Sequence, residues 1–329
     1  MNSFGRLFRI SIYGESHGKA VGITIDGCPA GLPISVDDFN TDLSRRKSGA
    51  KGTTPRTEAD IPKLISGVFN NKTTGAPLSI HFENTNIKPK DYEGLRDQPR
   101  PGHADFVAQQ KFGGYGDFSG GGHFSGRLTV ALVAAGVIAK KIISPTTVEA
   151  KILEVGGRKD INQAIDEALA SHDSIGGLIE CTATKIPVGL GEPFFDSVES
   201  LISHIIFAIP ATKGIEFGSG FAATKMRGSE HNDLIISADG KTQTNHAAGI
   251  NGGISNGNDL IFRVAVKPTS SIGKVQNTFN FAHDAVEELK VEGRHDACIA
   301  LRIPPVIEAA TAIVLADLML IEQKVKRVL

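Results

Sequence analysis

Two histidines in glycine-containing turns are the residues of this sequence with the most chemistry to offer. His17 lies in GESHG (14–18), and His103 lies in RPGHAD (100–105). Because the unperturbed pKa of histidine is near neutrality, either ring can accept or deliver a proton at physiological pH. A single loop histidine is usually a solvated polar residue, so each turn is a weak indication by itself. Arg, His and Asp recur beside glycine in GRHD (293–296), and this recurrence favours one composite site for a small anionic ligand.

The glycine run in DFSGGGHFSGRLT (117–129) is a further candidate for the same site. Glycine loses more conformational freedom on folding than any other residue, so three in a row need a reason. The run could cradle an anion, bind a cofactor or only turn the chain. The overlapping segment GYGDFSG (114–120) misses the dinucleotide fingerprint G-x-G-x-x-G by one residue and has no strand directly before it.

Cationic side chains are concentrated in the loop RRKSGAKGTTPR (45–56), which contains five of them and no acid. Its composition fits a solvated, mobile loop and a cationic lid over an anionic substrate equally well. Arginine favours the lid because a guanidinium captures carboxylate or phosphate through two parallel hydrogen bonds. KPTSS (267–271) follows a predicted strand, and its lysine and hydroxyls suit a phosphate, a cofactor tail or a plain turn.

A serine hydrolase is the first alternative, because GESHG formally matches G-x-S-x-G with Ser16 as the nucleophile. That motif requires a strand, a sharp turn and then a helix, whereas residues 20–26 read as a second strand. A non-catalytic protein that binds phosphate or flavin is the second alternative. The histidines show no spacing typical of metal ligands, so no metal site is expected.

The composition indicates a soluble globular protein. Thirty-five basic residues balance 36 acidic ones, so neither a nucleic-acid partner nor a membrane surface is expected. Three distant cysteines and the lack of a signal-peptide pattern predict a reduced, cytoplasmic protein. The apolar segment 304–321 is interrupted by Glu308 and Asp317, which favours a buried helix over a membrane span.

The elements that must position these loops are read from hydrophobic periodicity. Several predicted strands alternate apolar and polar residues, which favours antiparallel sheets over a parallel, Rossmann-like one. The helix predicted at 128–143 is apolar on nearly every face, so it should lie buried between layers. The predicted strands are 7–13, 20–26, 77–83, 147–155, 176–184, 259–266 and 297–303. The other predicted helices are 160–172, 197–209, 283–293 and one that starts at Pro304. No linker divides the chain, so one domain over residues 1–329 is expected.

Taken together, the motifs resemble those of chorismate synthases, in the same order and over nearly the whole chain. The matching segments are GESHG (14–18), RPGHAD (100–105), GGGHFSGRLT (120–129), NGGISNG (251–257), KPTSS (267–271) and GRHD (293–296). The resemblance implies an α+β fold, a layered sandwich with a helical core between two antiparallel β-sheets. It also implies a homotetramer.

The activity implied by the resemblance is that of a shikimate-pathway lyase. Such enzymes convert 5-enolpyruvylshikimate 3-phosphate to chorismate and phosphate by anti-1,4-elimination, with reduced FMN as cofactor. By motif match, His17 manages the protonation state of the flavin, His103 protonates the leaving phosphate, and Asp296 assists proton removal at flavin N5. The substrate carries two carboxylates and a phosphate, which gives the many arginines a physical reason.

The resemblance also implies two sets of binding residues. The substrate would be bound by Arg45, Arg46, Arg100, Ser125 and Arg127. FMN would be bound by His123, Phe124, Ser125, Pro210, Ala211, Gly252, Lys267, Pro268, Thr269, Ser270, Ser271 and Arg294. NADPH, as the reductant of the flavin, would be bound by Arg46.

Three departures from the family pattern affect these implied roles. Many members read GGRSSARET where this chain has GGHFSGRLT, so His123 and Phe124 replace an arginine and a serine. Gly52 aligns near a second family arginine of the basic loop, so NADPH binding rests on Arg46. Pro210 replaces an asparagine and has no backbone N–H to donate.

Overall fold

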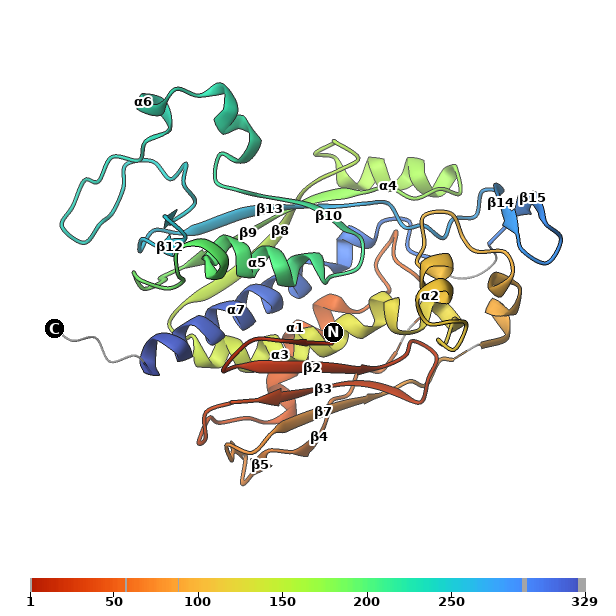
Figure 1. Ribbon diagram of the computed structural model, residues 1–329, viewed down its shortest axis with the longest axis horizontal. Coiled ribbons are helices and arrows are strands. Elements are labelled where there is room, and N and C mark those ends of the chain that lie inside the picture. The colour runs from red at the N-terminus through yellow and green to blue at the C-terminus, as the bar shows by residue number, and fades with distance from the viewer. Residues whose placement is uncertain (1, 57, 88, 292–294, 325–329) are drawn as a thin grey trace.

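The chain forms a layered sandwich with helices at its centre. The structure is a computed structural model that describes residues 2–56, 58–87, 89–291 and 295–324. Helices α3 (Thr129–Ile142) and α7 (Pro304–Lys324) run between two antiparallel sheets (Figure 1). The first sheet has the strand order β1-β2-β3-β7-β4 and packs on α3, and the second has the order β10-β13-β9-β8 and packs on α7. The predicted fold class is therefore confirmed.

The two main sheets contain nine strands, and three smaller strand pairs and five further α-helices complete the described fold. The first sheet contains β1 (Ser3–Phe4), β2 (Arg9–Gly14), β3 (Ala20–Asp26), β7 (Leu78–Glu83) and β4 (Lys63–Ser66). The second contains β10 (Thr212–Phe217), β13 (Leu260–Val266), β9 (Gly177–Thr184) and β8 (Thr147–Val155). Smaller pairs are β5 (Val68–Phe69) with β6 (Lys72–Thr73), β11 (Ile250–Asn251) with β12 (Ile254–Ser255), and β14 (Gln276–Asn280) with β15 (Ala285–Leu289). The remaining α-helices are α1 (Asn40–Arg46), α2 (Asp105–Lys111), α4 (Ile161–Ala170), α5 (Val198–Phe207) and α6 (Gly228–His231).

Two predicted elements are wrong. Residues 283–293 were expected to be helical, but Ala285–Leu289 form β15, which pairs antiparallel with β14. Pairing with the preceding segment overrides the helix propensity of its Ala, Glu and Leu residues. Residues 297–303 were expected to be a strand, but Ile299–Arg302 form a 3₁₀ turn that leads into α7.

The two acids of α7 are buried and fully engaged. Glu308 binds Arg45, Lys140 and the backbone N–H of Ala150. Asp317 accepts the backbone N–H groups of residues 6–8. Among the described residues α7 is the one helix long and apolar enough to cross a membrane, and 83% of its apolar window is buried inside the protein. The expected buried helix is confirmed.

Gly136 allows the two central helices to approach each other closely. A Cβ at Gly136 would overlap Ala309 of α7. We expect Gly136→Ala to lower the free energy of unfolding by about 1–3 kcal/mol, because overpacking outweighs the gain in helix propensity. Urea denaturation measures this, with Gly228→Ala as the control. Gly228 has open space around it and a helical position, so its replacement should be neutral or slightly stabilising. Equal stabilities of the two variants would contradict close packing at Gly136.

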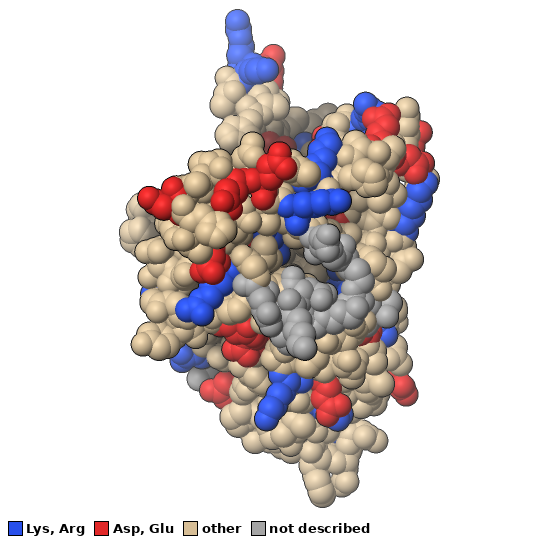
Figure 2. Space-filling view, turned by 90° about the vertical axis from the view of Figure 1, so that its right-hand side faces the viewer, with Lys and Arg blue, Asp and Glu red and all other residues tan. Residues whose placement is uncertain are grey.

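Charges on the end of the molecule shown in Figure 2 are mixed. Lys and Arg side chains alternate there with Asp and Glu, so the described residues of this face form no extended surface of one sign.

Candidate active site

One cavity of about 720 Å³ gathers most of the predicted site residues from distant parts of the chain. Its basic wall contains Arg46, Arg56, Arg100, Arg127 and Arg302, together with Lys47, Lys213 and Lys267. Its acids are Glu58, Asp60 and Asp296. Apolar side chains such as Ile10, Leu132 and Ile205 line another part of the wall. A cavity with this excess of cations over carboxylates suits an anionic ligand that also has an apolar part.

The glycine run packs directly against both candidate catalytic histidines. Gly120 and Gly121 have φ angles of 61° and 86°, in the left-handed region that favours glycine. A Cβ at Gly120 would overlap Nδ1 and Cε1 of His17, and a Cβ at Gly121 would lie 3.0 Å from Cε1 of His103. The glycines therefore let the backbone pass between two rings that lie 86 positions apart in the sequence.

His17 is held as a neutral ring. It is 6% exposed and packs edge-on against Tyr92, with 4.9 Å between ring centroids. Burial lowers its pKa, and the nearby Arg56 charge lowers it further, against a hydrogen bond with the Ser119 backbone and the charges of Asp117 and Glu58, which raise it. Its Nδ1 atom is buried with no hydrogen-bond partner among the described residues. His17 can therefore accept a proton or a hydrogen bond from a ligand.

These environments predict a dependence of stability on pH. Burial lowers the pKa of His295 as well, with Arg100 as the next cause. Both rings bind a proton less readily in the folded chain than in the unfolded chain, whose histidines titrate near about 6.5. Stability should therefore rise with pH from the native pKa values up to about 6.5 and level off above it. Urea midpoints measured across this range should show the rise, and His17→Gln should reduce it. An unchanged slope in His17→Gln would contradict the buried neutral ring.

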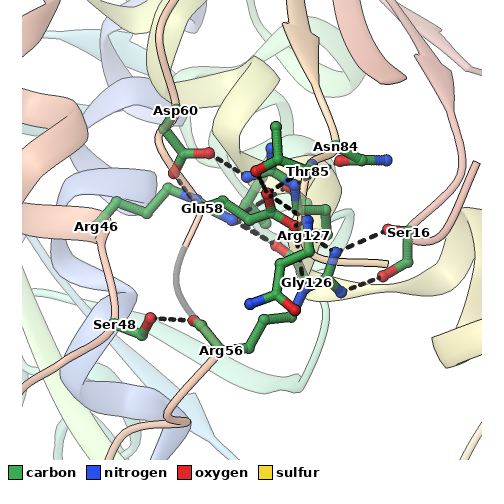
Figure 3. A network of polar contacts seen from close by, with 12 residues as sticks. Ser16, Arg46, Ser48, Arg56, Glu58, Asp60, Asn84, Thr85, Gly126 and Arg127 are labelled. Carbon is green, nitrogen blue, oxygen red and sulfur yellow. Dashed lines mark hydrogen bonds and ion pairs between the residues drawn. The ribbon is translucent and has the colours of Figure 1, made fainter. Parts of the chain in front are cut away.

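Arg46 and Arg127 share the carboxylate of Asp60 in the cavity wall (Figure 3). Arg46 is 3% exposed, and its donors also reach Thr129 Oγ1 at 3.0 Å and the carbonyl oxygen of Gly126 at 3.1 Å. Burial lowers the pKa of Arg46 to about 9, so it remains protonated at neutral pH. Arg127 also donates to Asn84 Oδ1 at 3.0 Å, and its Nη2 atom is buried with no partner among the described residues. Two guanidinium groups against one carboxylate leave a positive charge and a free donor for an anion.

Arg56 is a site residue that the motif match missed. It donates to Ser16 Oγ at 3.1 Å, to the Ser16 carbonyl oxygen at 3.0 Å and to Glu58 Oε1 at 2.8 Å. Glu58 and Asp60 were missed too, although both follow the basic loop directly in the sequence and supply the negative charge that this loop lacks. Ser16 is 1% exposed. A buried serine bound by an arginine is no nucleophile, which removes the structural basis of the hydrolase alternative.

Only three of the five cations of the basic loop line the cavity. They are Arg46, Lys47 and Arg56. Arg45 does not line the cavity, because its guanidinium forms two hydrogen bonds to Glu308, at 2.7 and 2.8 Å. Lys51 pairs with Asp166 outside the cavity. The loop is tied to the segment after the GRHD motif, since the Cys298 N–H donates to the Gly52 carbonyl oxygen at 3.0 Å.

The RPGHAD turn and the KPTSS loop are bound to each other. Arg100 Nη1 donates to Ser271 Oγ at 2.9 Å, and Lys267 Nζ donates to the Gly102 carbonyl oxygen at 2.7 Å. Ser270 Oγ donates to the same carbonyl at 2.8 Å. These side chains hold the turn that carries His103, so the loop offers a ligand mainly its backbone and Thr269, whose Oγ1 is buried without a partner among the described residues.

The other predicted site residues divide into three groups. Those that line the cavity are Phe124, Ser125, Pro210, Ala211, Pro268 and Asp296. His123 also lines it and tethers the glycine loop, with Nδ1 2.8 Å from the Gly14 carbonyl oxygen and Nε2 3.1 Å from Asn2 Oδ1. Gly252 lies in the turn between β11 and β12, away from the cavity. Arg294 lies outside the described residues.

Comparison with known proteins assigns the chain to a family. The family model described as chorismate synthase matches residues 8–320. This chain belongs to the chorismate synthase family. It is 62% identical to the chorismate synthase of Chitinophaga pinensis, over 100% of this chain and 99% of that one. It is 41% identical to the chorismate synthase of Methanocaldococcus jannaschii, over 97% and 96% of the two chains.

Comparison of structures supports the same fold. A crystal structure of chorismate synthase matches with a TM-score of 0.75 and 24% identity, over 97% of this chain and 93% of that one. Membership of the chorismate synthase family makes the chain an enzyme, a lyase of the shikimate pathway that serves aromatic amino acid biosynthesis.

Proposed function

We propose that this cavity binds reduced FMN and 5-enolpyruvylshikimate 3-phosphate together, and that the enzyme releases phosphate from this substrate by anti-1,4-elimination to form chorismate. The observation that carries the proposal is the convergence of the two candidate catalytic histidines and five arginines on one cavity with few carboxylates. A substrate with two carboxylates and a phosphate needs such a surplus of buried positive charge, because each anion must be paired once water is excluded.

The residues present fit FMN. The left-handed glycines let the loop pack against the rings of His17 and His103, and both rings line the cavity. Thr212 and Thr269 each present a buried hydroxyl without a partner among the described residues, and Ala211 adopts φ 73° at the same wall. We infer that these groups, with the backbone of residues 267–271, would hold the flavin and its phosphate. Reduced FMN would lend electron density to the carbon–oxygen bond that breaks.

The roles of the chain's own residues follow from their surroundings. His103 would deliver a proton to the leaving phosphate. Asp296, which lies 3.3 Å from Arg302 and accepts the Thr54 N–H at 2.9 Å, would accept a proton. His17, neutral at physiological pH, would accept a proton or a hydrogen bond beside the flavin and so manage its protonation state. Arg100, Arg127 and Ser125 would bind the substrate. Binding of NADPH at Arg46 stays a prediction, and the buried position of Arg46 gives it no support.

We also infer that residues 1–329 form one domain and assemble as a homotetramer in the cytoplasm. The first sheet packs on α3, the second packs on α7, and these two helices pack on each other, which supports one domain. Gly252 can contact a flavin only if a second copy brings it to the cavity, and exposed apolar side chains offer surfaces for such copies. These are Phe194, Phe195, Phe221, Leu234, Ile235 and Ile236. Three buried free cysteines suit a reducing compartment. Light scattering on the purified protein should give the mass of four chains.

One anaerobic assay tests the proposed function. The enzyme is mixed with dithionite-reduced FMN and 5-enolpyruvylshikimate 3-phosphate, and phosphate and chorismate are measured. We expect equimolar release of both, and none with oxidised FMN. A flavin-binding protein without this activity would bind FMN and release nothing, and this result would refute the proposal.

A further inference from the structure

His103 has an acidic neighbour to which the motif match assigns no role. Nδ1 of His103 lies 2.6 Å from Oδ1 of Asp105, two residues further along the chain. The side chain of Asp105 is 7% exposed and that of His103 is 21% exposed. The contact is therefore largely shielded from water, and its geometry decides which ring nitrogen carries a proton.

Asp105 is itself held by Arg100. The carboxylate accepts hydrogen bonds from Arg100 N at 3.1 Å, Nε at 2.7 Å and Nη2 at 2.8 Å. Although burial raises the pKa of Asp105, hydrogen bonds from Arg100 and then from His103 hold it well below its usual range. The carboxylate thus stays ionised at physiological pH and acts only as an acceptor.

These contacts decide whether Nδ1 of His103 carries a hydrogen. Arg100 Nη2 also lies 3.0 Å from His103 Nδ1, but a guanidinium can only donate. If Nδ1 accepted from Arg100, its lone pair would face the carboxylate at 2.6 Å, which is repulsive. Both the Nδ1–H and the Nη2–H must therefore point to Oδ1 of Asp105. The opposite edge of the ring, with Cε1 and Nε2, lies beside Gly121, and His103 lines the cavity.

We propose that Asp105 is a positioning residue that fixes His103 in the Nδ1–H tautomer and leaves Nε2 as the proton-transferring atom toward the cavity. Asp105 also stabilises the imidazolium that forms when Nε2 takes up a proton, while Arg100 balances the carboxylate charge. The catalytic part of this inference rests on the proposed function, in which the proton on Nε2 passes to a leaving phosphate. The tautomer itself does not depend on that function.

Nitrogen-15 NMR of the full-length protein tests the tautomer without any assay. At mildly alkaline pH, and with the ring assigned through His103→Gln, the wild-type enzyme should show a protonated Nδ1 and an unprotonated Nε2. Asp105→Asn should populate the other tautomer, because its amide can donate to Nδ1. A protonated Nε2 in the wild-type enzyme would overturn the proposal.

Steady-state kinetics with reduced FMN and the enolpyruvyl substrate test whether Asp105 supports proton transfer by His103. Asp105→Asn should lower kcat about 10- to 100-fold with little change in KM, in line with other groups that orient a histidine. Asp38→Asn is the matched control, since Asp38 pairs with Lys141 outside the cavity, and it should keep the wild-type kcat. A wild-type kcat in Asp105→Asn refutes the positioning role. If the wild-type enzyme releases no phosphate, the proposed function fails while the spectrum still decides the tautomer.

Discussion

Replacing His103 with alanine is expected to lower kcat for phosphate release by about 100- to 10,000-fold, the range typical for loss of a general acid. His103 lies at the cavity wall against Gly121, and no other described histidine shares its contacts with Arg100 and Asp105. Because the ring would act on the leaving group, the dissociation constant of FMN should change little. Anaerobic stopped-flow kinetics and titration of FMN fluorescence measure the two quantities separately.

The control for this substitution is His283→Ala. His283 contacts Glu287 beside the β14–β15 hairpin and does not line the cavity, so its loss should leave kcat at the wild-type value. A loss of FMN affinity that matches the loss of kcat in His103→Ala would show that His103 binds the cofactor and does not act as the acid.

The second large effect is expected for Arg127→Met. This substitution removes one of two cations from Asp60 and removes the buried Nη2 donor that has no partner among the described residues. Breaking a buried pair typically costs about 3–5 kcal/mol, and we expect the lower part of this range because Arg46 still faces Asp60. Loss of a charged donor to the substrate should lower kcat/KM by about 100- to 1,000-fold.

Urea denaturation and steady-state kinetics test the two parts of this prediction. Arg158→Met is the matched control, because Arg158 pairs with Glu167 on the surface and such pairs contribute about 0–1 kcal/mol. A variant Arg127→Met that binds the substrate as tightly as the wild-type enzyme would contradict the role of this guanidinium.

The layers of the fold could be predicted because the two central helices and most strands of the two sheets have a hydrophobic pattern of their own. Alternation of apolar and polar residues favoured antiparallel strands, among them 176–184 and 259–266, and the segment 128–143, apolar on nearly every face, predicted a buried helix. The hairpin at 285–289 could not be predicted from its residues, since its partner strand rather than its own propensity decides its conformation.

For the site, too, the residue types could be read from the sequence, but their contacts depend on distant parts of the chain. Arg45 and Arg46 look equivalent in the sequence, but neighbours on a helix point about 100° apart. Arg45 therefore reaches Glu308 of α7, while Arg46 reaches Asp60 at the cavity. The glycine run predicted that the backbone of residues 120–122 approaches another group closely, but the sequence did not show which group. Only the fold shows that Gly120 and Gly121 make room for two histidine rings.

We propose that one cavity holds the flavin and the substrate side by side, next to His17 and His103. A crystal structure of the enzyme with FMN and 5-enolpyruvylshikimate 3-phosphate tests it most directly. We predict both ligands in the 720 Å³ cavity, with the substrate anions on Arg100 and Arg127 and the flavin beside residues 120–122. FMN bound elsewhere, or substrate bound away from both histidines, would contradict this proposal.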